Sequence, residues 1–192
     1  MTVDENIPMI AMVTRLTHQK GIDLLVNISD RLLQQNIQLV ILGNGDLHYE
    51  EHFKWLEYRY GNKVSTNIKF DNALANKIYA ASDMFLMPSL FEPCGLGQLI
   101  ALRYGSIPIV RETGGLKDTV TAYNEYTGEG NGFSFTNYNS DDLYNLIEYA
   151  LSIYKDKKQW NKLIKQGMNC DNSWDKSSYI YLNIYRELTG QQ

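Results

Sequence analysis

The sequence predicts one α/β domain, built on a doubly wound parallel sheet with helices on both faces. Short apolar runs alternate with longer amphipathic runs at the spacing of βαβ units. The short runs are apolar throughout, which is typical of strands that are buried on both faces. Right-handed crossovers between such strands produce a doubly wound sheet. The 192 residues contain 44% hydrophobic and 21% charged residues and show no linker or repeat, so we treat 1–192 as one domain.

The apolar runs place five strands over 7–13, 38–42, 64–70, 84–88 and 107–110, and a candidate sixth over 133–135. Helices are expected over 21–36, from the turn at 43–46 to about 60, and over 73–81 and 95–104. Three further helices, over 141–154, 158–167 and 175–188, close the chain. In the first helix, the inward face is predicted to carry Ile22, Leu25, Val26, Ile28, Leu32 and Leu33.

Charge and composition exclude several classes of partner. The net charge of −4 argues against a broad nucleic-acid-binding face, and the basic run 155–158 is interpreted as a solvated helix face. The apolar run 7–13 is too short to span a membrane. The only cysteines, Cys94 and Cys170, lie far apart without metal-ligand spacing, so neither a disulfide framework nor a zinc site is expected. A reducing cytoplasm is the simpler location.

Ligands of open α/β sheets bind beyond the carboxyl ends of the strands, so the residues that follow the strands are the candidates. Arg15 and Lys20 follow the first strand, five residues apart, in a loop that leads into a helix. A guanidinium fork and an ammonium group would suit a diphosphate and would stabilise charge on a departing phosphate. The alternative is two solvated surface cations. His18, in the same loop, is interpreted as a surface histidine.

The turn Gly43-Asn44-Gly45-Asp46 follows the second strand. Its glycines would let the backbone approach a ligand closely. The third glycine of a dinucleotide fingerprint is lacking, so NAD binding is not supported. A plain turn in which Asp46 caps the next helix explains the same residues.

Two further segments present backbone N–H groups at predicted helix starts, where an anion can bind. After the fourth strand, Glu92 precedes Cys94, Gly95 and Leu96, and its carboxylate could accept hydrogen bonds from a sugar ring. Cys94 could be a nucleophile with a lowered pKa, but a small residue that contacts a ligand through its backbone is favoured. After the fifth strand, Thr113 and Gly114 repeat the arrangement, or form a simple capped turn with Asp118 on the helix surface.

The order of these motifs resembles bacterial glycogen synthases and plant starch synthases. The resemblance is carried by Phe91-Glu92-Pro93-Cys94-Gly95-Leu96-Gly97-Gln98-Leu99, by Ala101 to Gly105, by Pro108 and Val110-Arg111, by Thr113-Gly114-Gly115-Leu116-Lys117-Asp118-Thr119-Val120, and by Arg15-Leu16-Thr17 followed by Gln19-Lys20-Gly21. It is strong over 7–120 and weaker towards the final helix.

The resemblance implies the C-terminal half of a GT-B enzyme, which has two Rossmann-like domains with the active site between them. Such enzymes retain anomeric configuration and transfer glucose from ADP-glucose to the non-reducing end of an α-1,4-glucan. By position, the catalytic groups would be Arg15 and Lys20 on the donor diphosphate and Glu92 on the sugar. The donor-binding positions would be Gly43, Gly45, Phe70, Cys94, Gly95, Leu96, Thr113 and Gly114. No metal or other cofactor is implied, because the cations and helix ends neutralise the diphosphate.

Phe70 stands where the family usually has tyrosine and would stack on adenine, although a core aromatic explains it equally well. Gly97 replaces the family's usual threonine, which removes a hydroxyl at the phosphate end. Ile100 stands where broader relatives carry a second glutamate, which agrees with the synthase branch.

Family members are more than twice as long and include an N-terminal domain with a Lys-x-Gly-Gly-Leu donor loop. The chain alone is therefore expected to be inactive and to need that domain as its partner. In the family the C-terminal helix crosses to the other domain, so the region 174–185 is expected to expose apolar residues. Two alternatives stay open: a retaining GT-B transferase that uses a UDP-sugar, and a non-catalytic module that binds nucleotide-sugar or glucan.

Overall fold

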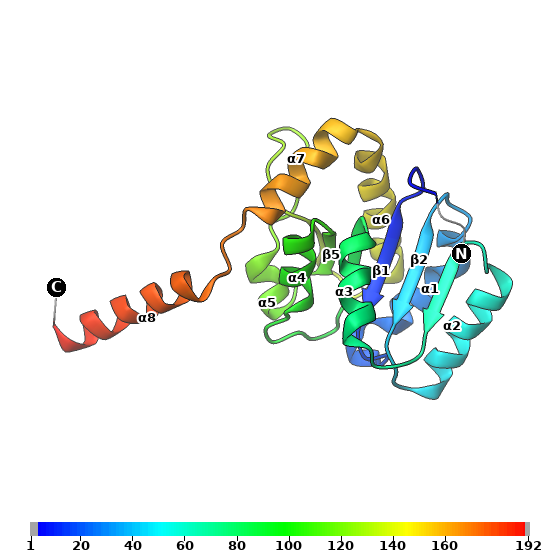
Figure 1. The fold of residues 1–192 in the computed structure, drawn as a ribbon, viewed down its shortest axis with the longest axis horizontal. Coiled ribbons are helices and arrows are strands. Elements are labelled where there is room, and N and C mark those ends of the chain that lie inside the picture. The colour runs from blue at the N-terminus through cyan, green and yellow to red at the C-terminus, as the bar shows by residue number, and fades with distance from the viewer. Residues whose placement is uncertain (1–3, 191–192) are drawn as a thin grey trace.

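The computed structural model describes residues 4–190, which form one parallel sheet with helices on both faces (Figure 1). Its strands are β1 (Met9–Val13), β2 (Gln38–Leu42), β3 (Val64–Asn67), β4 (Met84–Met87), β5 (Ile107–Arg111) and β6 (Phe133–Phe135). They lie in the order β3-β2-β1-β4-β5-β6, and every pairing is parallel. The predicted doubly wound class is confirmed, and the candidate sixth strand is present.

The helices are η1 (His18–Lys20, a 3-10 turn), α1 (Ile22–Leu32), α2 (Leu47–Arg59), α3 (Asn72–Ala81), α4 (Gly97–Tyr104), α5 (Gly114–Thr119), α6 (Ser140–Lys155), α7 (Lys157–Met168) and α8 (Trp174–Thr189). Buried residues of α1, α2 and α6 form one apolar core, and those of α3 and α4 form another on the opposite face of the sheet. The sheet is therefore covered on both sides, as the apolar strands require.

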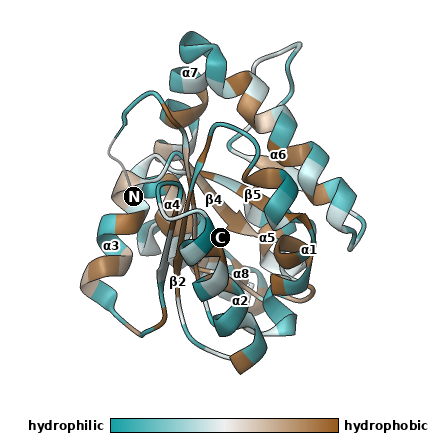
Figure 2. Ribbon diagram, turned by 90° about the vertical axis from the view of Figure 1, so that its right-hand side faces the viewer, coloured by the Kyte–Doolittle hydropathy of each residue, from teal (hydrophilic) through white to brown (hydrophobic). Residues whose placement is uncertain are grey.

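Neighbouring residues of one strand belong to different cores. In β1, Ile10 and Met12 pack under α1, whereas Ala11 packs on the side of α3. β2 divides in the same way, with Leu39 on one side and Val40 on the other. This alternation is the two-residue period of a strand with both faces buried. Figure 2 shows strands drawn mostly in the hydrophobic colour between helices of mixed colour.

Two predicted elements end earlier than expected. The first helix stops near Leu33. There the Lys63 ammonium group donates hydrogen bonds to the carbonyl oxygens of Leu33 and Gln35, at 2.9 and 2.8 Å. The third strand stops at Asn67 because its partner β2 ends at Leu42, opposite that residue. Phe70 therefore lies outside the sheet, and its side chain is 81% exposed.

Helix α8 extends away from the rest of the chain (Figure 1) and contains no buried residue. Its large apolar side chains are open to solvent, with Trp174 84% and Leu188 79% exposed. The expectation of exposed apolar residues in this region is confirmed. Between residues 4 and 190, no helix is both long and apolar enough to cross a membrane.

Candidate functional site

The strand order creates a switch point between β1 and β4. From β1 the chain proceeds outward to β2 and β3, and then returns to place β4 on the other side of β1. The loops that follow β1 and β4 therefore lie side by side at the carboxyl edge of the sheet, where ligands of this fold class bind. Two hydrogen bonds join them: Leu90 N to Gln19 O at 3.0 Å, and Gln19 Nε2 to Phe91 O at 3.3 Å.

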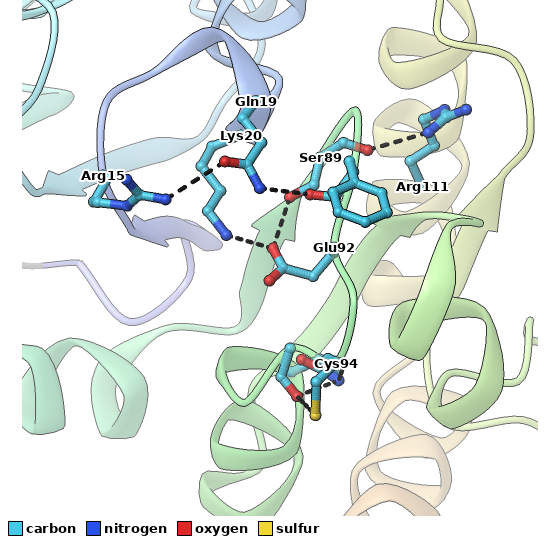
Figure 3. A network of polar contacts seen from close by, with 10 residues as sticks. Arg15, Gln19, Lys20, Ser89, Glu92, Cys94 and Arg111 are labelled. Carbon is cyan, nitrogen blue, oxygen red and sulfur yellow. Dashed lines mark hydrogen bonds and ion pairs between the residues drawn. The ribbon is translucent and has the colours of Figure 1, made fainter.

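Lys20 and Glu92 meet at this junction (Figure 3). Lys20 Nζ lies 2.6 Å from Glu92 Oε2, and the two side chains are only 16% and 10% exposed. The hydroxyl of Ser89 donates a second hydrogen bond to the same carboxylate oxygen at 3.2 Å. Two residues 72 positions apart in sequence are thus held by a largely shielded, charge-assisted contact, which is stronger than a pair on the open surface.

Arg15 lies beside this pair with its guanidinium directed towards Gln19, at 3.5 Å from that amide oxygen (Figure 3). Arg15 also lines a cavity of about 220 Å³ together with Gly43 and Phe70. The interpretation of Phe70 as a core aromatic is wrong, because its ring stands at the surface beside this cavity. The predicted cation, glycine and aromatic ring share one hollow at the edge of the sheet.

The glycines of the turn after β2 allow two loops to touch. A Cβ atom at Gly43 would lie 1.7 Å from Thr14 O, and one at Gly45 would lie 2.2 Å from Leu16 O. Their close neighbour is therefore the loop after β1. Asp46 occupies the N-cap position of α2 but makes no capping hydrogen bond through its side chain, so that part of the prediction is wrong. The carboxylate of Glu50 instead accepts from Gly45 N at 2.9 Å.

The start of α5 packs against the backbone of the Glu92 loop. Gly115 N donates to Glu92 O and Pro93 O at 3.2 Å each, and a Cβ atom at Gly114 would lie 2.1 Å from Glu92 O. Thr113 precedes α5 without a capping bond from its side chain. On the other side of the loop, Leu96 occupies the N-cap position just before α4, also without a side-chain cap. The predicted donor-binding positions on the two segments are thus brought together.

Two residues that hold the loops of the site in place were not identified individually from the sequence. Arg111 Nη1 donates to Leu90 O at 2.9 Å and to Ser89 O at 3.3 Å, which fixes the loop that carries Glu92. Gln19 connects Arg15 to the same loop. Both stand inside the motifs that carried the resemblance, but only tertiary contacts reveal what they hold.

Two predicted minor features lie where their sequence suggested. His18 is a largely exposed histidine, with Nδ1 at 3.2 Å from Asp23. The hydroxyl of Tyr138 donates a hydrogen bond to the same carboxylate. Burial, and then the hydrogen bond and negative charge of Asp23, raise the pKa of Tyr138 well above its usual value. Cys94 is exposed, and its Sγ donates a weak hydrogen bond to Gly95 O at 3.8 Å. Within the described part of the chain, no group of three or more His, Cys, Asp or Glu residues is placed to hold a metal ion.

A doubly wound parallel sheet with shielded charges and uncapped helix starts at its switch point defines a Rossmann-like domain. The chain belongs to the glycosyl transferases group 1 family, whose model matches residues 2–167.

Several similar relatives carry the name glycogen synthase. The chain is 82% identical over 191 residues to the glycogen synthase of Clostridium beijerinckii, and 66% identical over 188 residues to that of Clostridium perfringens. These matches cover 100% and 98% of this chain but 40% and 39% of the relatives. The chain therefore spans about two fifths of the length of the curated relatives that it matches.

Solved structures share the fold. The catalytic domain of starch synthase IV from Arabidopsis thaliana, bound to ADP and acarbose, superimposes with a TM-score of 0.87 at 37% identity, covering 97% of this chain and 39% of that chain. The C-terminal domain of a group 1 glycosyl transferase from Francisella tularensis, at 19% identity and a TM-score of 0.68 over 86% of both chains, has the same fold.

Proposed function

We propose that this chain is the donor-binding part of a retaining glucosyltransferase that moves glucose from ADP-glucose to the non-reducing end of an α-1,4-glucan. The observation that carries the proposal is the convergence of Arg15, the Lys20–Glu92 pair and the Phe70 cavity on one edge of the sheet. The relatives named glycogen synthase support it, as does the starch synthase neighbour bound to ADP and acarbose.

The layout of the site assigns a part of the donor to each group. Phe70 and its cavity take the adenine ring, whose flat face stacks well on an aromatic side chain. Arg15 and Lys20 hold the diphosphate and stabilise the negative charge that builds on the departing ADP. Glu92 accepts hydrogen bonds from the glucose hydroxyls, while Cys94, Gly95 and Leu96 line the sugar through their backbones. The positive charges of Arg15 and Lys20 neutralise the diphosphate without a metal ion.

Glucose transfer requires more groups than this edge of the sheet provides. Stabilisation of a transition state needs preorganised groups in a cleft that excludes water, and the edge described here is open. We therefore assign the activity to a longer protein, in which a second domain covers the donor and presents the glucan, and in which the apolar side chains of α8 pack against that domain. The two free thiols, Cys94 and Cys170, fit a cytoplasmic location.

Calorimetry with ADP tests the proposal. Arg15→Ala and Lys20→Ala are each expected to weaken ADP binding by about tenfold, because a hydrogen bond to a charged phosphate is lost. Lys77→Ala, which removes an exposed lysine of α3, is the matched control and is expected to bind ADP as the unsubstituted chain does. Addition of EDTA is expected to leave the affinity unchanged.

Equal ADP affinity in all four proteins, or no ADP binding at all, would contradict the assignment. Tighter binding of UDP than of ADP would favour a UDP-sugar donor. Binding of a maltooligosaccharide without any nucleotide binding would favour a glucan-binding module.

A further inference from the structure

Tyr79 carries a polar group with no partner inside the core between α3 and α4. Its side chain is 6% exposed, and its ring packs against Phe85, with the ring centroids 4.7 Å apart, and stacks on Tyr104 at 6.4 Å. Among the described residues, no hydrogen bond joins its hydroxyl to another group. The hydroxyl oxygen is not completely enclosed, so a hydrogen-bond partner from outside the chain can reach it.

The hydroxyl of Tyr79 is directed towards the functional edge of the sheet. Side chains on a helix lean towards the N-terminus of that helix, and the N-terminal residues of α3 lie at this edge. Asn72 and Ala75 line the Phe70 cavity, and Ala75 lies one turn before Tyr79. Tyr79 therefore stands directly below the wall of the cavity to which we assign the nucleotide.

The same hydroxyl reaches the first turn of α4. A Cβ atom built at Gly97, the first residue of that helix, would lie 3.4 Å from the Tyr79 oxygen, 3.3 Å from Phe85 Cε1 and 3.2 Å from Met87 Sδ. No side chain caps α4 at Leu96, so the N–H groups of its first turn are available to an anion. An unpaired donor and an uncapped helix start therefore face the same place.

Gly97 and Tyr79 share one space. A threonine at position 97 would be tight against Met87 Sδ and Phe85 Cε1 and would touch the phenol oxygen, while its own hydroxyl would stand at the start of α4. With glycine there, no side chain of residue 97 stands between the Tyr79 hydroxyl and the first turn of α4. Burial raises the pKa of Tyr79 to about 12, so the hydroxyl keeps its proton at neutral pH and can donate it to an acceptor.

We propose that Tyr79 is a donor-binding residue, whose hydroxyl donates a hydrogen bond to a phosphate oxygen of the nucleotide-sugar seated at the start of α4. Tyr79 supplies from α3 the hydroxyl that a threonine at position 97 would supply from α4. This inference rests on the proposed function, because the phosphate belongs to the donor assigned there.

Calorimetry with ADP and with adenosine tests it. Tyr79→Phe is expected to weaken ADP binding by about tenfold, since a hydrogen bond to a charged group is lost. Adenosine has no phosphate and is expected to bind the variant and the unsubstituted chain equally. Without ligand, the unfolding temperature is expected to stay within about 2 °C, since an unpaired hydroxyl adds little to the folded state. Tyr104→Phe, on the stacked neighbour, is the control and is expected to keep full ADP affinity.

A second variant restores the hydroxyl from the other helix. Gly97→Thr alone is expected to lower the unfolding temperature by a few degrees, because its Cβ is crowded by three atoms within 3.4 Å. Tyr79→Phe with Gly97→Thr removes the contact with the phenol oxygen and returns a hydroxyl to the start of α4. The ADP affinity of this double variant is expected to recover to within about threefold of the unsubstituted chain. That loss is smaller than the loss of about tenfold expected for Tyr79→Phe alone.

Three outcomes would overturn the role of Tyr79. The first is unchanged ADP affinity in Tyr79→Phe while Lys20→Ala loses affinity, which would leave the proposed function standing. The second is an equal loss for ADP and adenosine together with a lower unfolding temperature, which would make Tyr79 a packing residue. The third is a double variant as weak as Tyr79→Phe. Absence of ADP binding in the unsubstituted chain would instead overturn the proposed function itself.

Discussion

Lys20 and Glu92 neutralise each other in the structure, although the sequence suggested a separate partner for each. The contact is short, at 2.6 Å, and both side chains are largely shielded from solvent. A shielded pair is costly to break from one side, because the remaining charge is left without its partner. The pair therefore holds the two loops together before any donor is bound.

A double-mutant cycle measures this contact. Lys20→Met and Glu92→Gln are each expected to lower the free energy of unfolding by about 1–3 kcal/mol. The double variant is expected to lose less than the sum of the single losses, with a coupling of about 1 kcal/mol, because neither charge is left alone. Chemical denaturation measures all four proteins, and additive losses would contradict a coupled pair.

The location of Phe70 is decided by its neighbours and not by its residue type. Its type suits stacking on a base as well as packing in a core. The early end of β3 at Asn67 places it outside the sheet, beside Arg15 and Gly43. That end depends on the length of the partner strand, which no local pattern of residues 64–70 records.

Among the elements, α8 differs from every other helix longer than one turn, because it buries none of its residues. Its N-cap is in place, with Ser173 Oγ accepting from Lys176 N at 3.4 Å, but its apolar side chains contact solvent. The helix is thus defined locally and lacks the packing that usually stabilises helices in proteins.

Removal of residues 173–192 tests this description. The free energy of unfolding of the remaining chain is expected to change by less than about 0.5 kcal/mol, because no buried contact is lost. Binding of a dye specific for exposed apolar surface is expected to fall, because the exposed aromatic residues of α8 are removed. A large loss of stability would show that α8 packs on the sheet in solution.

Across the whole molecule, Asp83 connects the amino edge of the sheet to the closing helices. Its Oδ2 accepts a hydrogen bond from Met9 N at 2.8 Å, Tyr154 of α6 donates to its carboxylate, and Lys157 of α7 lies nearby. Burial is the largest influence and raises the pKa of Asp83 above its usual value, despite these favourable contacts. The folded state therefore favours the protonated carboxyl.

The sign of the pH dependence follows from this raised pKa. The contribution of Asp83 to stability is fully present below the pKa of the unfolded chain, near 3.9, and is lost as pH rises through the higher pKa of the folded state. Asp83→Asn keeps an acceptor for Met9 N and does not ionise. The unsubstituted chain is therefore expected to lose stability relative to Asp83→Asn as pH rises from below the unfolded value of about 3.9 towards neutral. Denaturation across this range checks the trend, and a constant difference would contradict it.

Much of the fold could be predicted because its information is local. The strands at 38–42 and 107–111 contain short apolar runs, and the two-residue period explains how each serves two cores. The helix starts at Asn139 and Asp156 carry side chains that cap their own first turns. The predicted position of the site followed from topology, since residues after parallel strands gather at one edge.

By itself, the sequence determined the α/β class, the order of elements and the residue types available for a diphosphate, because periodicity and loop position are written along the chain. Only the tertiary structure decided three contacts. Lys20 pairs with Glu92, Arg111 holds the loop that carries Glu92, and Tyr79 reaches the first turn of α4. These contacts join residues 18 to 72 positions apart. The crossover that returns β4 beside β1 sets the first contact, the pairing of β5 with β4 sets the second, and the packing of α3 against α4 sets the third, so no pattern within one segment specifies them.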